Sequence, residues 1–515
     1  MAEMGFWNFA QQDPEKLALV DPNEKLWTRG ELLDQANRIA HGLRSLGLKQ
    51  GDCVAVVLEN CAEFYQIHLA ITQIGMYMTP INNHLTGPEI AYIVQDSGAK
   101  IFIGSARFQD ACVAAREELD FPTTHAFSVG PVDGFRPFAE LTDGQRTTMP
   151  EDRLAGQVMN YTSGTTGRPK GVRRGLAPIS PDLVATLTTG FLGMFGLQPE
   201  DDNVHICGSP LYHTAVLVFS SSSLHMGHAV VLMDKWMPAE MLRLIDQYKV
   251  THSHMVPTQF HRLLKLPDEV RERHDMGSLR TMIHAAAPCP IETKWKMLDW
   301  WGDTIYEYYA ATEGGGTLVT PQEWRKKPGT VGKAWANSDI KIYDEEANEL
   351  GAGAVGTVYM LLGQADFEYK DAGQKTRDNR IGNYFTVGDV GELDDDGYLF
   401  LRDRKTDMII SGGANIYPAE IEAELIQHPK VADVAVFGIP NDDWGEEIKA
   451  VIQPIDGETG GESLTAEIFS WCGDRLAKMK TPRTIDFLEE LPRDPNGKLY
   501  KRKLRDPYWE GRSQI

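Results

Sequence analysis

The first 250 or so residues alternate between amphipathic segments and short apolar runs. In residues 26–52, Thr28 is followed three positions later by Glu31, the pattern of a helix capping box, and apolar residues then recur at helical spacing. The apolar run CVAVVLEN at residues 53–60 predicts a buried strand. The alternation continues with helices at residues 62–76 and 238–250 and strands at residues 100–104 and 228–234. Repeated strand and helix units predict a doubly wound α/β body with mostly parallel sheets.

The pattern changes after about residue 335. Short alternating segments separated by glycine-containing turns, at residues 340–360 and 384–404, predict β-hairpins. The C-terminal part predicts a small α+β domain with helices at residues 418–427 and 462–478 and strands at residues 431–439, 447–455 and 483–491. Because the joint falls within residues 401–408, we expect an N-terminal domain at residues 1–404 and a C-terminal domain at residues 405–515.

Two stretches could be mistaken for something else. Residues 351–356, GAGAVG, fit the dinucleotide-binding pattern GxGxxG, but they precede the strand-like GTVYM and do not open a helix. We therefore predict a turn there. Four serines at residues 220–223 lie in an otherwise apolar run, which favours a helix interior over a linker.

Composition restricts the class of protein. A chain of 515 residues with 42% hydrophobic and 24% charged residues is typical of a globular protein of at least two domains. The formal charge of −22 argues against nucleic acid or an anionic membrane as the main partner. There is no apolar run long enough to span a membrane, no signal-like N-terminus and no CxxC pair among the six cysteines. We expect a cytoplasmic protein without an integral membrane segment, a zinc site or disulfides.

The clearest chemical motif is YTSGTTGRPKGV at residues 161–172. Glycine lets the backbone approach a polyanion, and Ser and Thr hydroxyls add hydrogen-bond donors, so the stretch predicts a phosphate-binding loop. A Walker loop requires Gly-Lys followed by Ser or Thr, whereas Lys170 lies between Pro169 and Gly171. The chain is therefore not a P-loop nucleoside triphosphatase. A solvated Ser/Gly/Thr loop is the plainer alternative.

This loop closely resembles the signature loop of the adenylate-forming superfamily, which comprises acyl-CoA synthetases, firefly-type luciferases and the adenylation domains of peptide synthetases. Further motifs that resemble those of the superfamily follow in the same order along nearly the whole chain: PLYH at residues 210–213, HAAAPCP at 284–290, EYYAATEGGG at 307–316, FTVGDVG at 385–391, DRKTDMII at 403–410 and the Gly-Lys at 497–498. The resemblance implies an α/β fold with a large N-terminal domain of doubly wound sheets plus a distorted β-barrel, and a small, mobile α+β C-terminal domain.

The resemblance also implies how ATP and Mg²⁺ would be bound. Tyr309 would stack on the adenine, and Thr312 would donate a hydrogen bond to the α-phosphate. Glu313 would bind Mg²⁺, because a hard cation takes carboxylate oxygen. Asp389 and Arg404 would contact the ribose. The full set of implied nucleotide-binding residues is Thr162, Ser163, Gly164, Thr165, Thr166, Gly167, Ala286, Ala287, Pro288, Glu307, Tyr308, Tyr309, Thr312, Asp389 and Arg404.

Other motifs imply sites for the acid and for coenzyme A. His213 would lie beside the acyl pocket and the pantetheine tunnel. Rotation of the small domain about a hinge at Thr406 would bring the loop of Ser411, Gly412 and Gly413 to line that tunnel. The implied acyl pocket comprises His213, Val216, Val218, Met255, Val256, Thr258, His284, Ala287 and Gly314. None of these is Lys or Arg, so a second carboxylate on the acid is not expected.

The implied catalytic residues are Lys170, His213, Glu313 and Lys498. Lys498 would place positive charge between the substrate carboxylate and the α-phosphate. The chain departs from the superfamily pattern where Ala285 and Ala286 replace two glycines, where Ala310 replaces another, where Val387 replaces Thr, and where Thr406 replaces the usual Lys or Asp. The two alanines leave the backbone able to bond the purine but narrow the space beside the acyl chain.

These observations predict an ATP-dependent carboxylic acid:CoA ligase that forms acyl-AMP and pyrophosphate, and then a thioester and AMP. No covalent enzyme intermediate is needed, so no cysteine is assigned a catalytic role. Two alternatives are an acyl-AMP ligase that loads the phosphopantetheine of a carrier protein and a catalytically silent nucleotide-binding protein. The acid could be a fatty acid, an aromatic acid or a steroid- or terpenoid-like acid.

Overall fold

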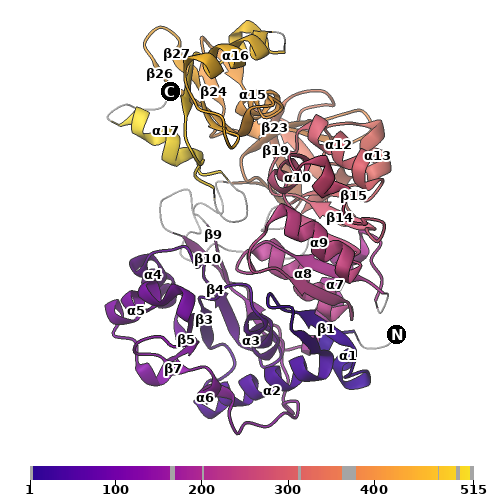
Figure 1. Cartoon of the computed structure of the whole chain (residues 1–515), viewed down its shortest axis with the longest axis vertical. Coiled ribbons are helices and arrows are strands. Elements are labelled where there is room, and N and C mark those ends of the chain that lie inside the picture. Colours follow the sequence, from indigo (N-terminus) through magenta and orange to yellow (C-terminus); the bar gives the residue numbers. More distant parts are fainter. Residues whose placement is uncertain are drawn as a thin grey trace. The chain divides into compact units, whose positions relative to one another are not determined.

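The computed structural model describes residues 4–162, 169–199, 202–310, 315–361, 379–473, 475–493 and 499–510. The chain forms two compact units. The first contains residues 4–254 and 267–282, and the second contains residues 255–266, 283–361 and 379–510 of the described chain. Figure 1 shows the elements of each unit, coloured along the sequence.

A parallel sheet of six strands forms one half of the first unit, in the order β7-β6-β5-β3-β4-β8. Alternate residues of its central strands face opposite sides: Val54 and Val56 pack in the cluster that includes α2 and α3, whereas Ala55 and Phe102 pack in the cluster that includes α4 and α5. The helices α2, α3, α4 and α5 are seen beside this sheet in Figure 1. Both faces are covered, which is the reason that the strands are continuously apolar. The elements are α2 (Arg29–Ser45), β3 (Cys53–Val56), α3 (Ala62–Thr72), β4 (Tyr77–Pro80), α4 (Gly87–Ser97), β5 (Ala99–Ser105), α5 (Gln109–Glu118), β6 (Ala126–Val129), β7 (Arg136–Pro137), α6 (Ala139–Thr142) and β8 (Gln157–Val158).

The predicted capping box of α2 is present. Thr28 Oγ1 accepts a hydrogen bond from the Glu31 amide at 3.2 Å, and Glu31 Oε2 accepts one from the Thr28 amide at 2.9 Å. Such a cap contributes about 1 kcal/mol because it satisfies amides that have no partner within the helix.

A second sheet of the first unit contains β1, β2, β11, β12 and β13, in which all pairs but β1 with β2 are parallel. The predicted helix through the four serines is confirmed: Ser220 to Ser223 are buried in α8, and the Ser220 hydroxyl donates to the Val216 carbonyl at 2.8 Å. The elements are α1 (Phe6–Gln12), β1 (Leu17–Val20), β2 (Leu26–Thr28), α7 (Pro181–Gly193), β11 (Val204–Cys207), α8 (Thr214–His225), β12 (Ala229–Leu232), α9 (Pro238–Tyr248), β13 (His252–Met255), α11 (Asp268–Arg271) and β14 (Thr281–His284), of which β13 and β14 begin in the first unit and end in the second.

The second unit contains an antiparallel ladder of β15, β16 and β17 and a six-stranded antiparallel sheet, β18 to β23. The described strands of that sheet run in an open path from β20 to β23, where the resemblance implied a distorted barrel. The predicted turn at residues 351–356 leads directly into β19. The elements are α10 (Pro257–Leu264), α12 (Ile291–Trp301), β15 (Ile305–Ala310), β16 (Gly316–Val319), α13 (Pro321–Lys326), β17 (Lys333–Ala334), β18 (Ile340–Tyr343), β19 (Gly356–Leu361), β20 (Arg380–Ile381), β21 (Tyr384–Phe385), β22 (Asp389–Leu393) and β23 (Leu399–Arg404).

The second unit ends with a five-stranded sheet ordered β25-β24-β27-β26, with β28 beside β27. The helix predicted at residues 462–478 was too long, because α16 ends at Gly473 and glycine is a poor helix former. The C-terminal basic run forms a helix, α17, that was not predicted. The elements are β24 (Ile409–Ser411), β25 (Ala414–Ile416), α15 (Pro418–Leu425), β26 (Val431–Asn441), β27 (Gly445–Pro454), α16 (Glu462–Gly473), β28 (Thr484–Phe487) and α17 (Lys501–Trp509).

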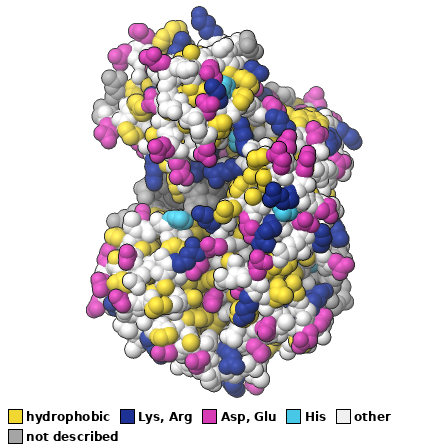
Figure 2. Space-filling view, in the orientation of Figure 1, with side chains coloured by type: hydrophobic (Ala, Val, Ile, Leu, Met, Phe, Trp, Pro, Cys, Tyr) yellow, Lys and Arg dark blue, Asp and Glu magenta, His cyan; other side chains and the backbone are white. Residues whose placement is uncertain are grey.

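Acidic side chains are scattered over the visible face of the molecule and interspersed with Lys and Arg, consistent with the formal charge of −22 (Figure 2). Within the described ranges, no helix is long and apolar enough to cross a membrane. All six cysteines fall in these ranges and are free thiols.

Candidate active site

A short hairpin carries the predicted phosphate loop. Strands β9 (Asn160–Thr162) and β10 (Lys170–Val172) pair antiparallel, with Lys170 opposite Thr162. The hairpin therefore brings the two ends of the loop together. The loop residues Ser163, Gly164, Thr165, Thr166 and Gly167 lie outside the described residues, as do the side chains of Thr162 and Lys170.

Three tyrosines hold the base of this hairpin, and sequence reasoning missed them. Tyr161 donates to Asp96 Oδ2 at 2.5 Å, and Tyr92 donates to the Pro169 carbonyl at 3.2 Å. Tyr77 donates to the Arg174 carbonyl at 2.7 Å. Burial and the neighbouring Asp96 carboxylate raise the pKa of Tyr161, so it stays a hydrogen-bond donor. The i, i+4 spacing of a tyrosine and an aspartate on α4 was the available signal.

Three predicted nucleotide-binding residues meet in the second unit. The Tyr309 hydroxyl, on β15, donates to Oδ2 of Asp389 at 2.6 Å. Arg404 lies opposite Asp389 in the β22–β23 ladder, and its Nε is 3.4 Å from Asp389 Oδ1. Asp389 is only 8% exposed, whereas Arg404 is open to solvent. The two partners orient the carboxylate, whose remaining lone pairs can accept hydrogen bonds from a diol.

The side chain of Glu307, also predicted to bind nucleotide, is turned into the protein. Its Oε2 lies 2.5 Å from Lys294 Nζ and 3.5 Å from His284 Nε2, and all three side chains are buried. Burial raises the pKa of Glu307, while the Lys294 ammonium opposes this shift. The Lys294 ammonium also lies 4.8 Å from the centroid of the Trp324 ring. Glu307 thus anchors β15 to α12, and Tyr308 beside it is buried.

In the turn after β14, one of the alanines that replace glycine has an unfavourable backbone conformation. Ala286 has φ = 74°, in the left-handed region that glycine adopts freely and alanine does not. Ala287 and Pro288 complete the turn before α12. The neighbouring Cys289 thiol has its pKa raised by burial, so it is a neutral, poorly nucleophilic group.

The predicted acyl-pocket residues fall in both units. In the first unit His213 precedes α8, with its ring 4.5 Å from that of Tyr212, and Val216 is buried while Val218 is 37% exposed. In the second unit Met255, Val256 and His284 are buried, and Thr258 lies in the first turn of α10. Gly314 lies outside the described residues.

The predicted coenzyme A loop is the turn between β24 and β25. Ser411 pairs with Ala414, and Gly412 and Gly413 between them have φ values of 59° and 79°. The Gly412 amide donates to the Trp444 carbonyl at 2.8 Å, and a Cβ at Gly412 would lie 2.5 Å from the Trp444 ring. Only glycine fits this position, for both conformation and space.

Thr406, the predicted hinge residue, is exposed in the turn between β23 and β24. The predicted site residues Lys498, Thr312 and Glu313 lie outside the described residues. In the part of the chain that is described, no cluster of three or more His, Cys, Asp or Glu side chains is arranged to hold a metal ion.

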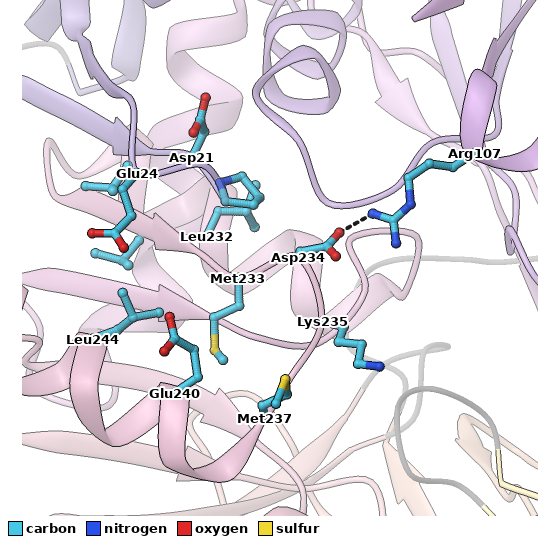
Figure 3. Close-up of a pocket in the computed structure, with 13 residues that line it drawn as sticks. Asp21, Glu24, Arg107, Leu232, Met233, Asp234, Lys235, Met237, Glu240 and Leu244 are labelled. Carbon is cyan, nitrogen blue, oxygen red and sulfur yellow. Dashed lines mark hydrogen bonds and ion pairs between the residues drawn. The ribbon is translucent and has the colours of Figure 1, made fainter. Parts of the chain in front are cut away.

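Two hollows of the first unit contain none of the predicted site residues. One, of about 320 Å³, lies where β1 and β12 end, and two of its charged side chains, Arg107 and Asp234, form an ion pair with each other (Figure 3). Glu24 on its rim bonds to Arg243. The other, of about 640 Å³, is lined largely by apolar residues, including Trp27, Phe135 and Phe138.

The chain is similar to known proteins along nearly its whole length. The chain matches the sequence model of the AMP-binding enzymes over residues 6–361 and that of the AMP-binding enzyme C-terminal domain over residues 420–498. It is 32% identical to the long-chain-fatty-acid–CoA ligase FadD13 of Mycobacterium tuberculosis strain H37Rv, covering 97% of both chains. It is 29% identical to the fatty acid–[acyl-carrier-protein] ligase ScoC of Streptomyces coeruleorubidus, covering 97% of this chain and 95% of that one.

The ATP-bound crystal structure of MatB from Rhodopseudomonas palustris superposes with a TM-score of 0.81 at 30% identity, covering 98% of this chain and 99% of that one. The α/β fold and the order of the motifs therefore have one explanation: the chain belongs to the AMP-binding enzyme family, within the adenylate-forming superfamily.

Proposed function

We propose that the chain is an ATP-dependent carboxylic acid:CoA ligase. The observation that carries the proposal is the contact of Tyr309 and Arg404 with Asp389, at positions where the superfamily resemblance implies an adenosine site. The Asp389 carboxylate can accept hydrogen bonds from both ribose hydroxyls. Because its two partners already orient this carboxylate, binding of a nucleotide would lose little conformational entropy at Asp389.

In the first half-reaction, the carboxylate of the acid attacks the α-phosphorus of ATP, and the bond to pyrophosphate breaks to give acyl-AMP. The carboxylate and the phosphates repel each other, so positive charge must lie between them. In our proposal Lys170 and Lys498 supply that charge, and Thr312 donates to the α-phosphate. Glu313 would hold Mg²⁺, which neutralises phosphate charge when bound.

In the second half-reaction, the thiol sulfur of coenzyme A attacks the carbonyl carbon of acyl-AMP, and the bond to AMP breaks. The C-terminal domain, residues 405–515, rotates about Thr406 between the two steps and exchanges Lys498 for the loop of Gly412 and Gly413. The short, exposed link between β23 and β24 supports this view. His213 then lies beside the reacting acyl group.

We propose a monocarboxylic acid with an apolar body as the substrate. Val216, Met255 and Val256 are buried and apolar, and no predicted pocket position carries a lysine or arginine that would bind a second carboxylate. The six free thiols support a reducing compartment such as the cytoplasm. The acid-library assay described below distinguishes fatty, aromatic and steroid- or terpenoid-like acids within this class.

A second candidate function is transfer of the acyl group to the phosphopantetheine of a carrier protein. The similarity to ScoC, whose name describes a ligase for an acyl carrier protein, favours this candidate. Both candidates share the first half-reaction and differ only in the thiol that discharges acyl-AMP.

One assay separates these candidates from a silent nucleotide-binding protein. Purified protein is given Mg²⁺, ATP and a library of carboxylic acids, and exchange of labelled pyrophosphate into ATP is measured, followed by AMP release on addition of free coenzyme A. We expect exchange with one class of acid and AMP release with free coenzyme A. Exchange without discharge by coenzyme A indicates the carrier-protein ligase, and absence of exchange with every acid contradicts both enzymes.

A further inference from the structure

The link between the two sheets of the second unit is short. Strand β23 ends at Arg404 and β24 begins at Ile409, which leaves four residues, 405–408, between a sheet that carries Asp389 and the C-terminal sheet. The Lys405 amide donates to the Gly388 carbonyl at 2.8 Å, and both Lys405 and Thr406 are exposed. A link of four residues makes few contacts of its own. Contacts between residues on either side of it must therefore hold the two sheets in one arrangement.

Asp403, on the near side of this link, makes such a contact. It pairs with Val390 in the β22–β23 ladder, and its Oδ2 accepts a hydrogen bond of 2.8 Å from the amide of Ala419. Ala419 is the second residue of α15, whose N-cap residue Tyr417 offers no side-chain cap. Asp403 therefore caps a helix that lies beyond the link, and a carboxylate at a helix N-terminus is also favoured by the helix dipole.

Beyond the link, α15 also carries a partly buried ion pair with α17. Lys501 Nζ, in the first turn of α17, lies 2.8 Å from Oε1 of Glu422 on α15, and the two side chains are only 15% and 21% exposed. The Val436 amide also donates to Glu422 Oε1, at 2.7 Å. Burial raises the pKa of Asp403, and the Lys501 ammonium opposes that shift. Burial opposes protonation of Lys501, but Glu422 and Asp403 outweigh it and raise its pKa, so Lys501 stays charged.

Lys501 follows Lys498 by three positions in the sequence. The described residues on both sides of Lys498 are held by backbone and side-chain contacts. Leu499 forms an antiparallel bridge with Arg493, and Arg493 binds the Asp433 carboxylate through Nε at 2.5 Å and Nη2 at 2.6 Å. On the other side, Arg505 of α17 donates to the Thr406 carbonyl at 3.1 Å. The helix that follows the proposed adenylation lysine is thus tied to the link itself.

From this geometry we infer that Asp403 is a positioning residue that latches the C-terminal domain in one of its two working arrangements by capping α15 across the link. The inference rests on the domain rotation of the proposed function. Asp403 belongs to the sheet before the link, and Ala419, Glu422 and Lys501 belong to the part beyond it. Rotation about residues 405–408 must separate them, so the latch favours one half-reaction over the other.

The test compares two substitutions that each remove one carboxylate charge. Asp403→Asn keeps an oxygen that can accept from Ala419, but the bond loses the strength that the carboxylate charge gives it, and Lys501 loses one of the negative charges that raise its pKa. Glu420→Gln is the matched control, because Glu420 also lies on α15 and its ion pair with Lys480, at 2.6 Å, does not cross the link. Hydrogen exchange of peptides covering residues 404–408 and 417–422 is measured, together with the rates of pyrophosphate exchange and of thioester formation from acyl-AMP.

For Asp403→Asn we expect at least about five-fold faster exchange at the Ala419 amide and in the link, and a change of at least about five-fold in the ratio of the two half-reaction rates, in the range typical of coupling between two states. Glu420→Gln should leave exchange in the link and the ratio within about two-fold of the unmodified protein. Unchanged link exchange in Asp403→Asn, or an equal effect of Glu420→Gln, would overturn the latch.

Hydrogen exchange needs no substrate, so it decides on the latch even if no acid is turned over and the proposed function fails. If Asp403→Asn does not fold, Lys501→Gln removes the positive charge that favours the ionised Asp403 carboxylate and is measured in the same way. It should accelerate exchange in the link and change the ratio of the two half-reaction rates by at least about five-fold. A ratio and a link exchange unchanged by Lys501→Gln contradict the inference.

Discussion

The hydroxyl of Tyr309 donates a hydrogen bond of 2.6 Å to Oδ2 of Asp389 and so joins β15 to β22 at the proposed ribose site. Tyr309→Phe keeps the ring that would stack on adenine and removes only this bond. We expect the KM for ATP to rise about ten-fold with a smaller effect on kcat, since a hydrogen bond to a charged group contributes about 1.5–3 kcal/mol. Steady-state kinetics in ATP, with AMP affinity by calorimetry, measure this.

A matched control exists in the sheet that carries Asp389. Tyr384 donates to Asp339 Oδ2 at 2.5 Å, outside the proposed site. Tyr384→Phe removes the same kind of bond, so it should leave the KM for ATP within two-fold or so. A similar rise in both variants would mean that Tyr309 acts only through the stability of the sheet.

The buried pair of Lys294 and Glu307 predicts a large stability effect. Lys294→Met leaves the Glu307 carboxylate buried without its cation, and we expect the free energy of unfolding to fall by about 3–5 kcal/mol. Adding Glu307→Gln removes the stranded charge and should restore part of the loss. Lys296→Met, which breaks an exposed pair with Glu292 on the same helix, should cost no more than about 0.5 kcal/mol in urea denaturation.

For Ala286 we predict a substitution that raises the stability of the protein. Its φ of 74° is a conformation that costs alanine about 1–2 kcal/mol and glycine little, so Ala286→Gly should raise stability, by about 0.5–1 kcal/mol after the entropy of the more flexible unfolded chain is subtracted. Ala287→Gly, at a position without positive φ, should lower stability. An increase in the melting temperature of the Ala287 variant alone would contradict the strain argument.

Buried histidines predict acid sensitivity of the first unit. Burial lowers the pKa of His205 to about 3 and that of His254 to about 4, from an ordinary value of 6.5. Each ring is neutral in the folded protein and protonated in the unfolded chain below pH 6.5, so the unfolded state binds more protons and stability falls as pH decreases from 6.5 toward 4. We expect the melting temperature to be flat above this window.

The pH dependence has its own control. His205→Gln should flatten the slope of the unfolding free energy between these pH values, by at most about 1.4 kcal/mol per pH unit. His41→Gln changes a ring at the surface, near the Thr148 carbonyl, and should leave the slope as it is. Equal slopes in all three proteins would assign the acid sensitivity to other groups.

Lys498→Ala tests the two-step use of one site. If Lys498 acts only in adenylation, its loss should reduce pyrophosphate exchange by about 10²- to 10³-fold, the range for removal of one preorganised donor. Thioester formation from synthetic acyl-AMP should be largely spared. Equal loss of both half-reactions would contradict a lysine that leaves the site before the thiol attacks.

Local patterns along the chain determined most of the elements. The capping box of Thr28 and Glu31, the buried serines of α8 and the turn at residues 351–356 were each readable from spacing, because each depends on neighbours in sequence. The ends of elements were less readable, as α16 shows. The helix α17 was missed because its sequence is basic and includes Pro507, which lowers its helix propensity. Its contacts with β26 stabilise it instead.

The motifs also named Tyr309, Asp389 and Arg404, although they are spread over nearly a hundred residues. What only the tertiary structure decided is which atoms meet. It turned Glu307 toward Lys294, set Tyr77, Tyr92 and Tyr161 around the base of the phosphate hairpin, and brought Asp403 to the amide of Ala419 beyond the link. Sequence specifies a helix or a strand through contacts between near neighbours. A hydrogen bond between distant strands depends on sheet order and register, which no local pattern encodes.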